Sequence, residues 1–350
     1  MNDNFDSIWL AGAFVMAAGL SALGTGLIRR YALRKLLLAI PNDRSSHDSP
    51  TPYGGGLAIA LVVLVGLTIL TLVGQLPLAH LAAIGGAGAA VALVGWWDDR
   101  SEIKPLRRLC LHTLAAGWGL IWLGGLPALP MLGGVVDLGL VGDALALIYL
   151  VWMLNLFNFM DGINGIAGGE AVSIGVGFVI IAWITGAPLS MLGISGLIVA
   201  ASLGFLPWNF PGGRIFMGDA GSGFLGLMLG LMTIHAGHIE PTFFWAGIVL
   251  SAVFWVDATC TLAVRAGRRQ RLHEAHRTHA YQHAARRHGH TRVTLAVLAI
   301  NGMVLLPVAV TVSIRVIPAD VAVVGVAVAL AAVAIYWNAG RPEEIHLSQA

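Results

Sequence analysis

"NLFNFMDGINGIAGGE", residues 155–170, contains three Asn, one Asp, one Glu and four Gly, yet it interrupts apolar sequence. The surrounding apolar sequence is long enough to cross a bilayer, for which a helix of about 20 residues suffices. Polar groups next to a membrane core are expensive, and they are more often functional than incidental. The stretch therefore predicts a membrane helix that ends in a chemically specialised turn.

The composition of the whole chain supports a membrane protein. Of its 350 residues, 57% are hydrophobic and only 11% are charged, against about 25% charged residues in a soluble domain. The first apolar run lacks a basic n-region and a cleavage site, which favours a retained helix over a signal peptide. Eleven candidate spans begin near residues 7, 54, 78, 107, 143, 165, 189, 220, 242, 293 and 319.

This pattern predicts an all-α fold, a polytopic transmembrane helical bundle of about 11 spans. Residues 1–340 are expected to form a single integral membrane domain, and residues 341–350 a short cytoplasmic tail. The lipid bilayer is therefore a partner, and no nucleic-acid partner is expected.

The basic residues orient the bundle. If the N-terminus lies outside, alternate connections and the tail hold 19 of the 20 Lys and Arg, and only Arg315 remains outside. The positive-inside rule then places these basic loops in the cytoplasm. The connection 265–292 alone holds eight Arg.

Acidic residues gather on the same cytoplasmic face. Asp98 and Asp99 end the third span in "GWWDDR". Adjacent carboxylates at a helix C-terminus oppose the helix dipole and repel each other, which favours a functional role. The alternative is a solvated helix end that pairs with Arg100 or Lys104.

The polar stretch quoted first has its own periodicity. On a helix, Asn155, Asn158 and Asp161 fall within about 120° of one another, so we expect them to face a common neighbour. The glycines that follow allow a tight turn. The alternative is a polar contact between two membrane helices, which explains one Asn better than the whole group.

A third polar group opens the eighth span. In "RIFMGDAGSGFLG", residues 214–226, Asp219 and Ser222 begin the helix, whose free backbone N–H groups form an anion site. Taken alone, the motif fits an ordinary N-cap followed by packing glycines. Its position on the same face as the other acids favours a functional site.

Two further segments are less specific. In the most basic loop, His273, His276, His279 and His283 are expected to follow one helical stripe. This pattern fits a zinc site poorly, and fits better either an amphipathic helix on anionic lipid or a phosphate-binding lid. In "PNDRSSHDSPTPYGGG", residues 41–56, a surface loop and a functional loop are almost equally favoured.

Carboxylates and amides beside a basic loop indicate Mg²⁺-assisted phosphoryl chemistry, because Mg²⁺ prefers oxygen ligands and substrate phosphates. Where cytoplasm meets hydrocarbon, one substrate can be a soluble nucleotide and the other a lipid. The main rival is a secondary transporter, which needs ionisable groups near the bilayer midplane. Asp257, the nearest candidate, lies closer to the cytoplasmic edge. A non-catalytic lipid-binding protein would not need paired carboxylates.

These motifs together resemble one family. "GWWDDRSEIKPLRRL", "NLFNFMDGINGIAGGE", "RIFMGDAGSGFLG" and the histidine-rich loop are similar to the polyprenyl-phosphate N-acetylhexosamine-1-phosphate transferases. That family includes phospho-MurNAc-pentapeptide translocase and the undecaprenyl-phosphate GlcNAc-1-phosphate transferases of O-antigen synthesis. The resemblance implies that a UDP-N-acetylhexosamine and undecaprenyl phosphate react to give undecaprenyl-diphospho-sugar and UMP.

The resemblance also implies roles for individual residues. Asp219 and Asn158 match metal ligands, and Asp98 stands where a base for the lipid phosphate is often proposed. That phosphate is already largely ionised at pH 7, so the role of Asp98 stays open between base and orienting group. Many relatives read "DGIDG", whereas Asn164 replaces the second acid here and is assigned to nucleotide contact.

The predicted site follows from both lines of reasoning. The predicted catalytic residues are Asp98, Asp99, Asp161, His279 and His283. The predicted substrate-binding residues are Arg44, His47, Asn155, Asn164 and Arg277. The predicted metal ligands are Asn158 and Asp219, for Mg²⁺ or Mn²⁺.

The resemblance further implies a multi-pass protein of the bacterial cell inner membrane. GlcNAc, FucNAc or QuiNAc fits as the sugar in the O-antigen branch. A membrane homodimer is common in the family.

Overall fold

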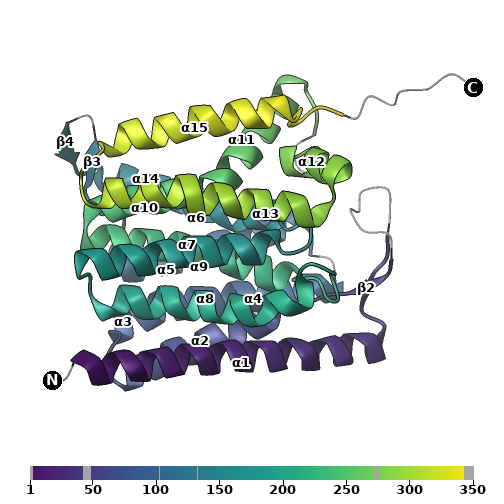
Figure 1. The fold of residues 1–350 in the computed structure, drawn as a ribbon, viewed down its shortest axis with the longest axis horizontal. Coiled ribbons are helices and arrows are strands. Elements are labelled where there is room, and N and C mark those ends of the chain that lie inside the picture. Colours follow the sequence, from purple (N-terminus) through teal and green to yellow (C-terminus); the bar gives the residue numbers. More distant parts are fainter. Residues whose placement is uncertain (1–2, 42–48, 102, 132, 272–275, 343–350) are drawn as a thin grey trace, which may run out of the picture.

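The computed structural model describes residues 3–41, 49–101, 103–131, 133–271 and 276–342 (Figure 1). Arg44, His47 and His273 lie outside the described residues. The predicted substrate-binding roles of Arg44 and His47 therefore remain predictions.

Helices dominate the described part of the chain, and one helical segment lies at each predicted span. In the first half these are α1 (Asp3–Lys35), α2 (Gly56–Leu72), α3 (Leu78–His80) continued by the π-helix η1 (Leu81–Gly85) and α4 (Gly86–Ser101), α5 (Pro105–Leu123) and α6 (Gly139–Met160). In the second half they are α7 (Ile166–Thr185), α8 (Leu189–Asn209), α9 (Asp219–Ile239), α10 (Pro241–Leu250), α11 (Ala252–Gly267), α12 (Ala280–His288), α13 (His290–Ile300) continued by the π-helix η2 (Asn301–Leu305) and α14 (Leu306–Ser313), and α15 (Ala319–Tyr336).

The chain is a multi-pass membrane protein. Among the described residues, eight helical segments are long and apolar enough to cross a membrane, and the pair α10–α11, bent by 65°, makes a ninth. The other two predicted spans are α2, which has 17 residues, and α5, whose first turn carries Arg107 and Arg108. The predicted polytopic helical bundle is thus confirmed. Of the two remaining spans, α2 is short and α5 is basic at its start.

Short strands mark the two ends of the bundle. β1 (Leu38–Ala39) pairs with β2 (Thr51–Pro52), and β3 (Leu129–Met131) pairs with β4 (Gly134–Val136), both antiparallel. Figure 1 shows α12 and β2 at one end, and β3, β4 and the start of α1 at the other. α15 ends on the side of α12, as expected for an odd number of crossings.

Helix α9 is the centre of the bundle. All its residues from Ala220 to Gly237 are buried, and α4, α6, α8 and α10 pack around it. Close approach requires glycine at its start, because a Cβ on Gly95 would lie 2.5 Å from the backbone nitrogen of Ala220. A Cβ on Gly56 would lie 2.4 Å from the Cα of Gly221. These contacts bring the N-terminus of α9 against the ends of α2 and α4.

Candidate active site

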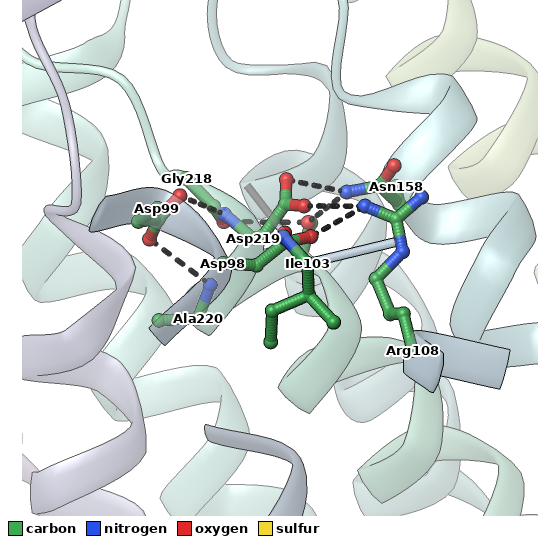
Figure 2. Close-up of polar contacts among 9 residues, drawn as sticks. Asp98, Asp99, Ile103, Arg108, Asn158, Gly218, Asp219 and Ala220 are labelled. Atoms are coloured by element: carbon green, nitrogen blue, oxygen red, sulfur yellow. Dashed lines mark hydrogen bonds and ion pairs between the residues drawn. The ribbon is translucent and has the colours of Figure 1, made fainter. Parts of the chain in front are cut away.

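The N-terminus of α9 presents Asp219 to the end of α6. The Asn158 amide donates hydrogen bonds to Asp219 Oδ1 at 2.7 Å and to Ser222 Oγ at 3.2 Å. The two predicted metal ligands therefore lie side by side, although they are 61 residues apart in sequence and belong to different helices. Figure 2 shows their oxygen and nitrogen atoms converging at this point.

Arg108, in the first turn of α5, bridges two of the acids. Its Nη1 lies 2.5 Å from Asp98 Oδ2 and 3.2 Å from Asp219 Oδ2 (Figure 2). The backbone N–H of Ile103 donates to Asp98 Oδ1 at 2.6 Å. The Asp98 side chain is only 7% exposed. Because both its oxygens have partners, Asp98 here acts as the anchor of Arg108.

Whereas the Asp98 carboxylate binds Arg108, the Asp99 carboxylate binds the start of α9. Its Oδ1 accepts the backbone N–H of Asp219 at 2.9 Å, and its Oδ2 accepts the N–H of Ala220 at 3.3 Å (Figure 2). The phenolic O–H of Tyr53 donates to the Asp99 carbonyl at 2.7 Å. The anion site predicted at the start of α9 is therefore occupied by Asp99, whose negative charge suits a helix N-terminus.

A polar cavity of about 340 Å³ opens beside these groups. Asp99, Asn158, Asp161, Asn164 and Asp219 all line it. The further lining residues come from the loops on either side and from the histidine-rich region; they include Tyr53, Asn209, Phe216, Ser222, Gln282 and His290. Residues from these separate motifs therefore line one cavity.

Two amides hold the loops that shape the cavity. Asn209 Oδ1 accepts the N–H of Gly165 at 2.6 Å, and its Nδ2 donates to the Ile215 carbonyl at 2.9 Å. Asn164 Nδ2 donates to the Pro211 carbonyl at 2.9 Å. Gly165 has a φ of 80°, which glycine adopts without the steric cost of a Cβ. The polar turn after α6 is thus tied to the loop that leads into α9.

Among the acids that line the cavity, Asp161 has the least compensation. It follows the last residue of α6 and lies at the cavity wall. Burial, reinforced by the negative charges of Asp219 and Asp99, raises its pKa well above the usual value. The cavity therefore has a negative potential that a cation would relieve.

The donor atoms fit a hard divalent cation bound together with substrate. Among the described residues, no three His, Cys, Asp or Glu side chains are arranged to hold a metal ion by themselves. Mg²⁺ does not need such a cage, since it usually takes one or two carboxylates plus waters and substrate phosphates. Asp161 and Asp219, with the amide of Asn158, supply oxygen ligands of that kind around the cavity.

The histidine-rich region differs from the predicted helical stripe. α12 begins at Ala280, and His279 is its N-cap, with extended backbone. Its buried ring places Nδ1 3.2 Å from Asp257 Oδ1. Asp257 also accepts the N–H of Ala280 at 3.0 Å and of Tyr281 at 2.9 Å. The stripe prediction was wrong for His276 and His279, because the helix starts only after them.

Several predicted residues stand apart from the cavity lining. Asn155 donates from its side chain to the Val151 carbonyl at 2.7 Å, one turn back along α6. Asn155 therefore does not line the cavity with Asn158 and Asp161. The other predicted residues absent from the lining are Asp98, Arg277, His279 and His283. His283 Nδ1 lies 2.8 Å from Arg286 Nη2.

The sequence reasoning missed Arg108, Tyr53, Asn209, Gln282 and His290. Arg108 was counted only as a loop charge, because nothing in the sequence distinguishes it from its neighbour. Gln282 and His290 lie in the histidine-rich region, and they were not predicted because the spacing of His273, His276, His279 and His283 was the only pattern considered there.

Comparison with known proteins agrees with this arrangement. The model of the family "Glycosyl transferase family 4" matches residues 80–237. The decaprenyl-phosphate N-acetylglucosaminephosphotransferase of Mycolicibacterium smegmatis is 31% identical over 323 residues, covering 79% of this chain and 77% of that protein. The chain belongs to glycosyl transferase family 4. The predicted family resemblance is therefore confirmed.

Other relatives of this family match smaller parts. The probable undecaprenyl-phosphate N-acetylglucosaminyl 1-phosphate transferase of Bacillus subtilis is 28% identical over 236 residues, which is 66% of this chain and 64% of that protein. The phospho-N-acetylmuramoyl-pentapeptide-transferase of Leuconostoc citreum is 28% identical over 262 residues, 70% of this chain and 80% of that protein. The match to the family model includes the acids, Arg108 and the turn after α6, and ends before the histidine-rich region.

Proposed function

We propose that the protein transfers N-acetylhexosamine-1-phosphate from a UDP-sugar to undecaprenyl phosphate, giving undecaprenyl-diphospho-sugar and UMP. The observation that carries the proposal is the single cavity formed by Asn158, Asp161, Asn164 and Asp219 at one end of a membrane bundle. Such a position lets a soluble nucleotide sugar and a membrane lipid meet. The names of the family relatives support the same reaction class.

The reaction exchanges one phosphoanhydride for another. A phosphate oxygen of the lipid attacks the phosphorus that carries the sugar, and the bond from that phosphorus to the UMP oxygen breaks. Because the lipid phosphate is largely ionised at pH 7, the protein mainly has to position the two anions and offset their charge. No protein nucleophile is required.

Arg108 and the acids have distinct parts in this proposal. Asp98 fixes Arg108, and Arg108 in turn fixes Asp219 at the cavity. Asp99 holds the start of α9 through its backbone N–H groups. Asp98, acting through Arg108, and Asp99 are therefore positioning residues for Asp219.

We further propose Mg²⁺ as the cofactor, with Mn²⁺ as a substitute, held by Asp219, Asn158 and Asp161. The bound metal would neutralise charge on the diphosphate. The excess of carboxylates in the cavity, and the raised pKa of Asp161, support a cation there.

For the sugar, we propose GlcNAc first, because the relatives from Bacillus and Mycolicibacterium are named for it. The product would then start a cell-envelope polysaccharide, of which O-antigen is one kind, at the inner membrane of a bacterium. FucNAc and QuiNAc are the competing sugars to include in a panel.

A secondary transporter is not favoured. Asp257, the candidate for an intramembrane ion site, accepts two backbone hydrogen bonds at the start of α12. The acids that line a cavity lie instead at the end of the bundle.

The proposal is tested by UMP release from purified protein. UDP-GlcNAc, UDP-FucNAc and UDP-QuiNAc are each supplied with and without undecaprenyl phosphate. We expect UMP from at least one donor only when the lipid is present. Uptake of a UDP-sugar into proteoliposomes without UMP release would contradict transfer and favour transport.

A further inference from the structure

A second cavity, apolar and separate from the active site, opens between α11, α13 and α15. Its volume is about 330 Å³. Its inner walls are aliphatic, and they include Val253, Val297, Ile300, Leu330 and Val333. We call this cavity the C-terminal cleft.

The C-terminal cleft runs along the helices. On α13 its lining extends from Arg292 to Ile300, and on the neighbouring α15 from Leu330 to Trp337, the residue that follows the helix. At 1.5 Å per residue these segments measure about 12 Å and about 10 Å. The cleft therefore extends along the helices as an apolar slot, in which part of one acyl chain can lie.

Basic groups stand at the cytoplasmic mouth of this slot. His288 and Arg292 line it beside Trp337, and the Arg287 guanidinium lies 5.7 Å from the centre of the Trp337 ring. Within the described part of the chain, Arg292 has no hydrogen bond or ion pair with another side chain. An apolar slot with a basic mouth complements a lipid with an anionic headgroup.

Among the described residues, the one acid that lines the cleft does not cancel this charge pattern. Asp257 is buried, and its carboxylate accepts the backbone N–H groups of Ala280 and Tyr281 and adjoins the His279 ring. Its charge is thus compensated inside the protein.

Tyr281 also separates the cleft from the active site. It is buried, and its O–H donates to the Phe159 carbonyl at 2.9 Å, near the end of α6. A lipid in the C-terminal cleft would have its headgroup at Arg292, which lines the cleft and not the active-site cavity. The acceptor lipid of the transfer reaction needs its phosphate at Asp219, so this slot suits a different lipid.

We propose that the C-terminal cleft binds a bilayer phospholipid with an anionic headgroup. One acyl chain lies between α11, α13 and α15, and the phosphate lies at Arg292 and His288. This site goes beyond the proposed transfer reaction, and its occupancy does not depend on turnover.

The test is native mass spectrometry of the purified full-length protein, titrated with phosphatidylglycerol and, separately, with neutral phosphatidylcholine. Ala296→Phe fills the cleft from an exposed position, and Leu295→Phe adds the same ring to the adjacent, lipid-facing position, which does not line it. Arg292→Gln removes the charge at the mouth, and Arg30→Gln on α1 is its matched control. Circular dichroism checks that every variant is folded.

We expect wild type, Leu295→Phe and Arg30→Gln to bind phosphatidylglycerol tightly and in preference to phosphatidylcholine. Ala296→Phe should weaken this binding at least tenfold. Arg292→Gln should weaken it about fivefold, the effect of about one basic residue near a lipid surface, and should reduce the preference over phosphatidylcholine.

Equal phosphatidylglycerol affinity in all five proteins would overturn the assignment. A competition arm separates the two sources of an anionic lipid. Undecaprenyl phosphate that leaves phosphatidylglycerol bound supports a separate phospholipid site. Undecaprenyl phosphate that displaces it from wild type would identify the cleft as part of the acceptor's path and refute the phospholipid assignment.

Discussion

Replacement of Arg108 by Gln should damage catalysis far more than the same change at its neighbour. Arg108 is the cation that holds Asp98 and Asp219 together, with its Nη1 2.5 Å and 3.2 Å from their Oδ2 atoms. Gln carries no charge and is shorter, so it cannot reach both acids. Asp219 would then lose its fixed position at the cavity.

The size of the effect follows from these contacts. A hydrogen bond to a charged group contributes about 1.5–3 kcal/mol. Arg108 is 30% exposed, which weakens each contact by solvent screening, whereas Asp98 is only 7% exposed and would lose its paired cation while it keeps the hydrogen bond from the Ile103 N–H. We take about 2–3 kcal/mol for the two contacts together. If this free energy is lost entirely from stabilisation of the transition state, kcat/KM drops about 30- to 160-fold.

The assay is UMP release at saturating Mg²⁺ with varied UDP-sugar. Arg107→Gln is the control, because Arg107 lies on the same turn of α5, is exposed and has the same charge. It should change kcat/KM less than threefold. If Arg108→Gln behaves like Arg107→Gln, the bridge has no role in positioning Asp219 and the reasoning is wrong.

Three further outcomes are expected. Removal of divalent ions with EDTA should abolish UMP release, and Mg²⁺ or Mn²⁺ should restore it; full turnover in EDTA would rule out the metal. The raised pKa of Asp161 means that the folded protein binds its proton more tightly than the unfolded chain, so stability should fall as pH rises from about 4 through the folded pKa. In EDTA the thermal midpoint should fall more steeply with pH in wild type than in Asp161→Asn, in which Asp219 still contributes; parallel curves would contradict it. His279→Ala should lower both the thermal midpoint, by the loss of the buried His279–Asp257 contact worth about 1 kcal/mol, and turnover; a large loss of turnover at an unchanged midpoint would instead assign His279 to catalysis.

The fold class could be predicted from the sequence, because membrane spans are recognised by their length and hydropathy. The structure has a helical segment at every predicted span, including the bent pair α10–α11. Helix starts were less predictable. α12 begins at Ala280 because Asp257, more than 20 residues earlier, accepts its first N–H groups. Such a long-range cap leaves no local pattern in the histidine-rich loop.

The same distinction holds for the site. Asn158, Asp161 and Asp219 were found because polar groups at a membrane face are conspicuous, and the structure brings them to one cavity. The different partners of Asp98 and Asp99 could not be predicted from the sequence. The two adjacent side chains differ in their contacts because Asp98 pairs with Arg108 of α5, whereas Asp99 binds the start of α9. Arg108 was missed for the same reason, because its two partners lie 10 and 111 residues away.

The central claim is that the phosphorus bonded to the sugar moves from the nucleotide to the lipid at Asp219. The most direct measurement uses a UDP-sugar with radioactive phosphorus at that position, undecaprenyl phosphate and purified protein, followed by partition between butanol and water. We predict that the label enters the butanol phase in a one-to-one ratio with the UMP released, and that Asp219→Asn, folded and inserted, transfers almost none. Label that stays in the aqueous phase while UMP appears, or transfer by Asp219→Asn at the wild-type rate, would contradict the account.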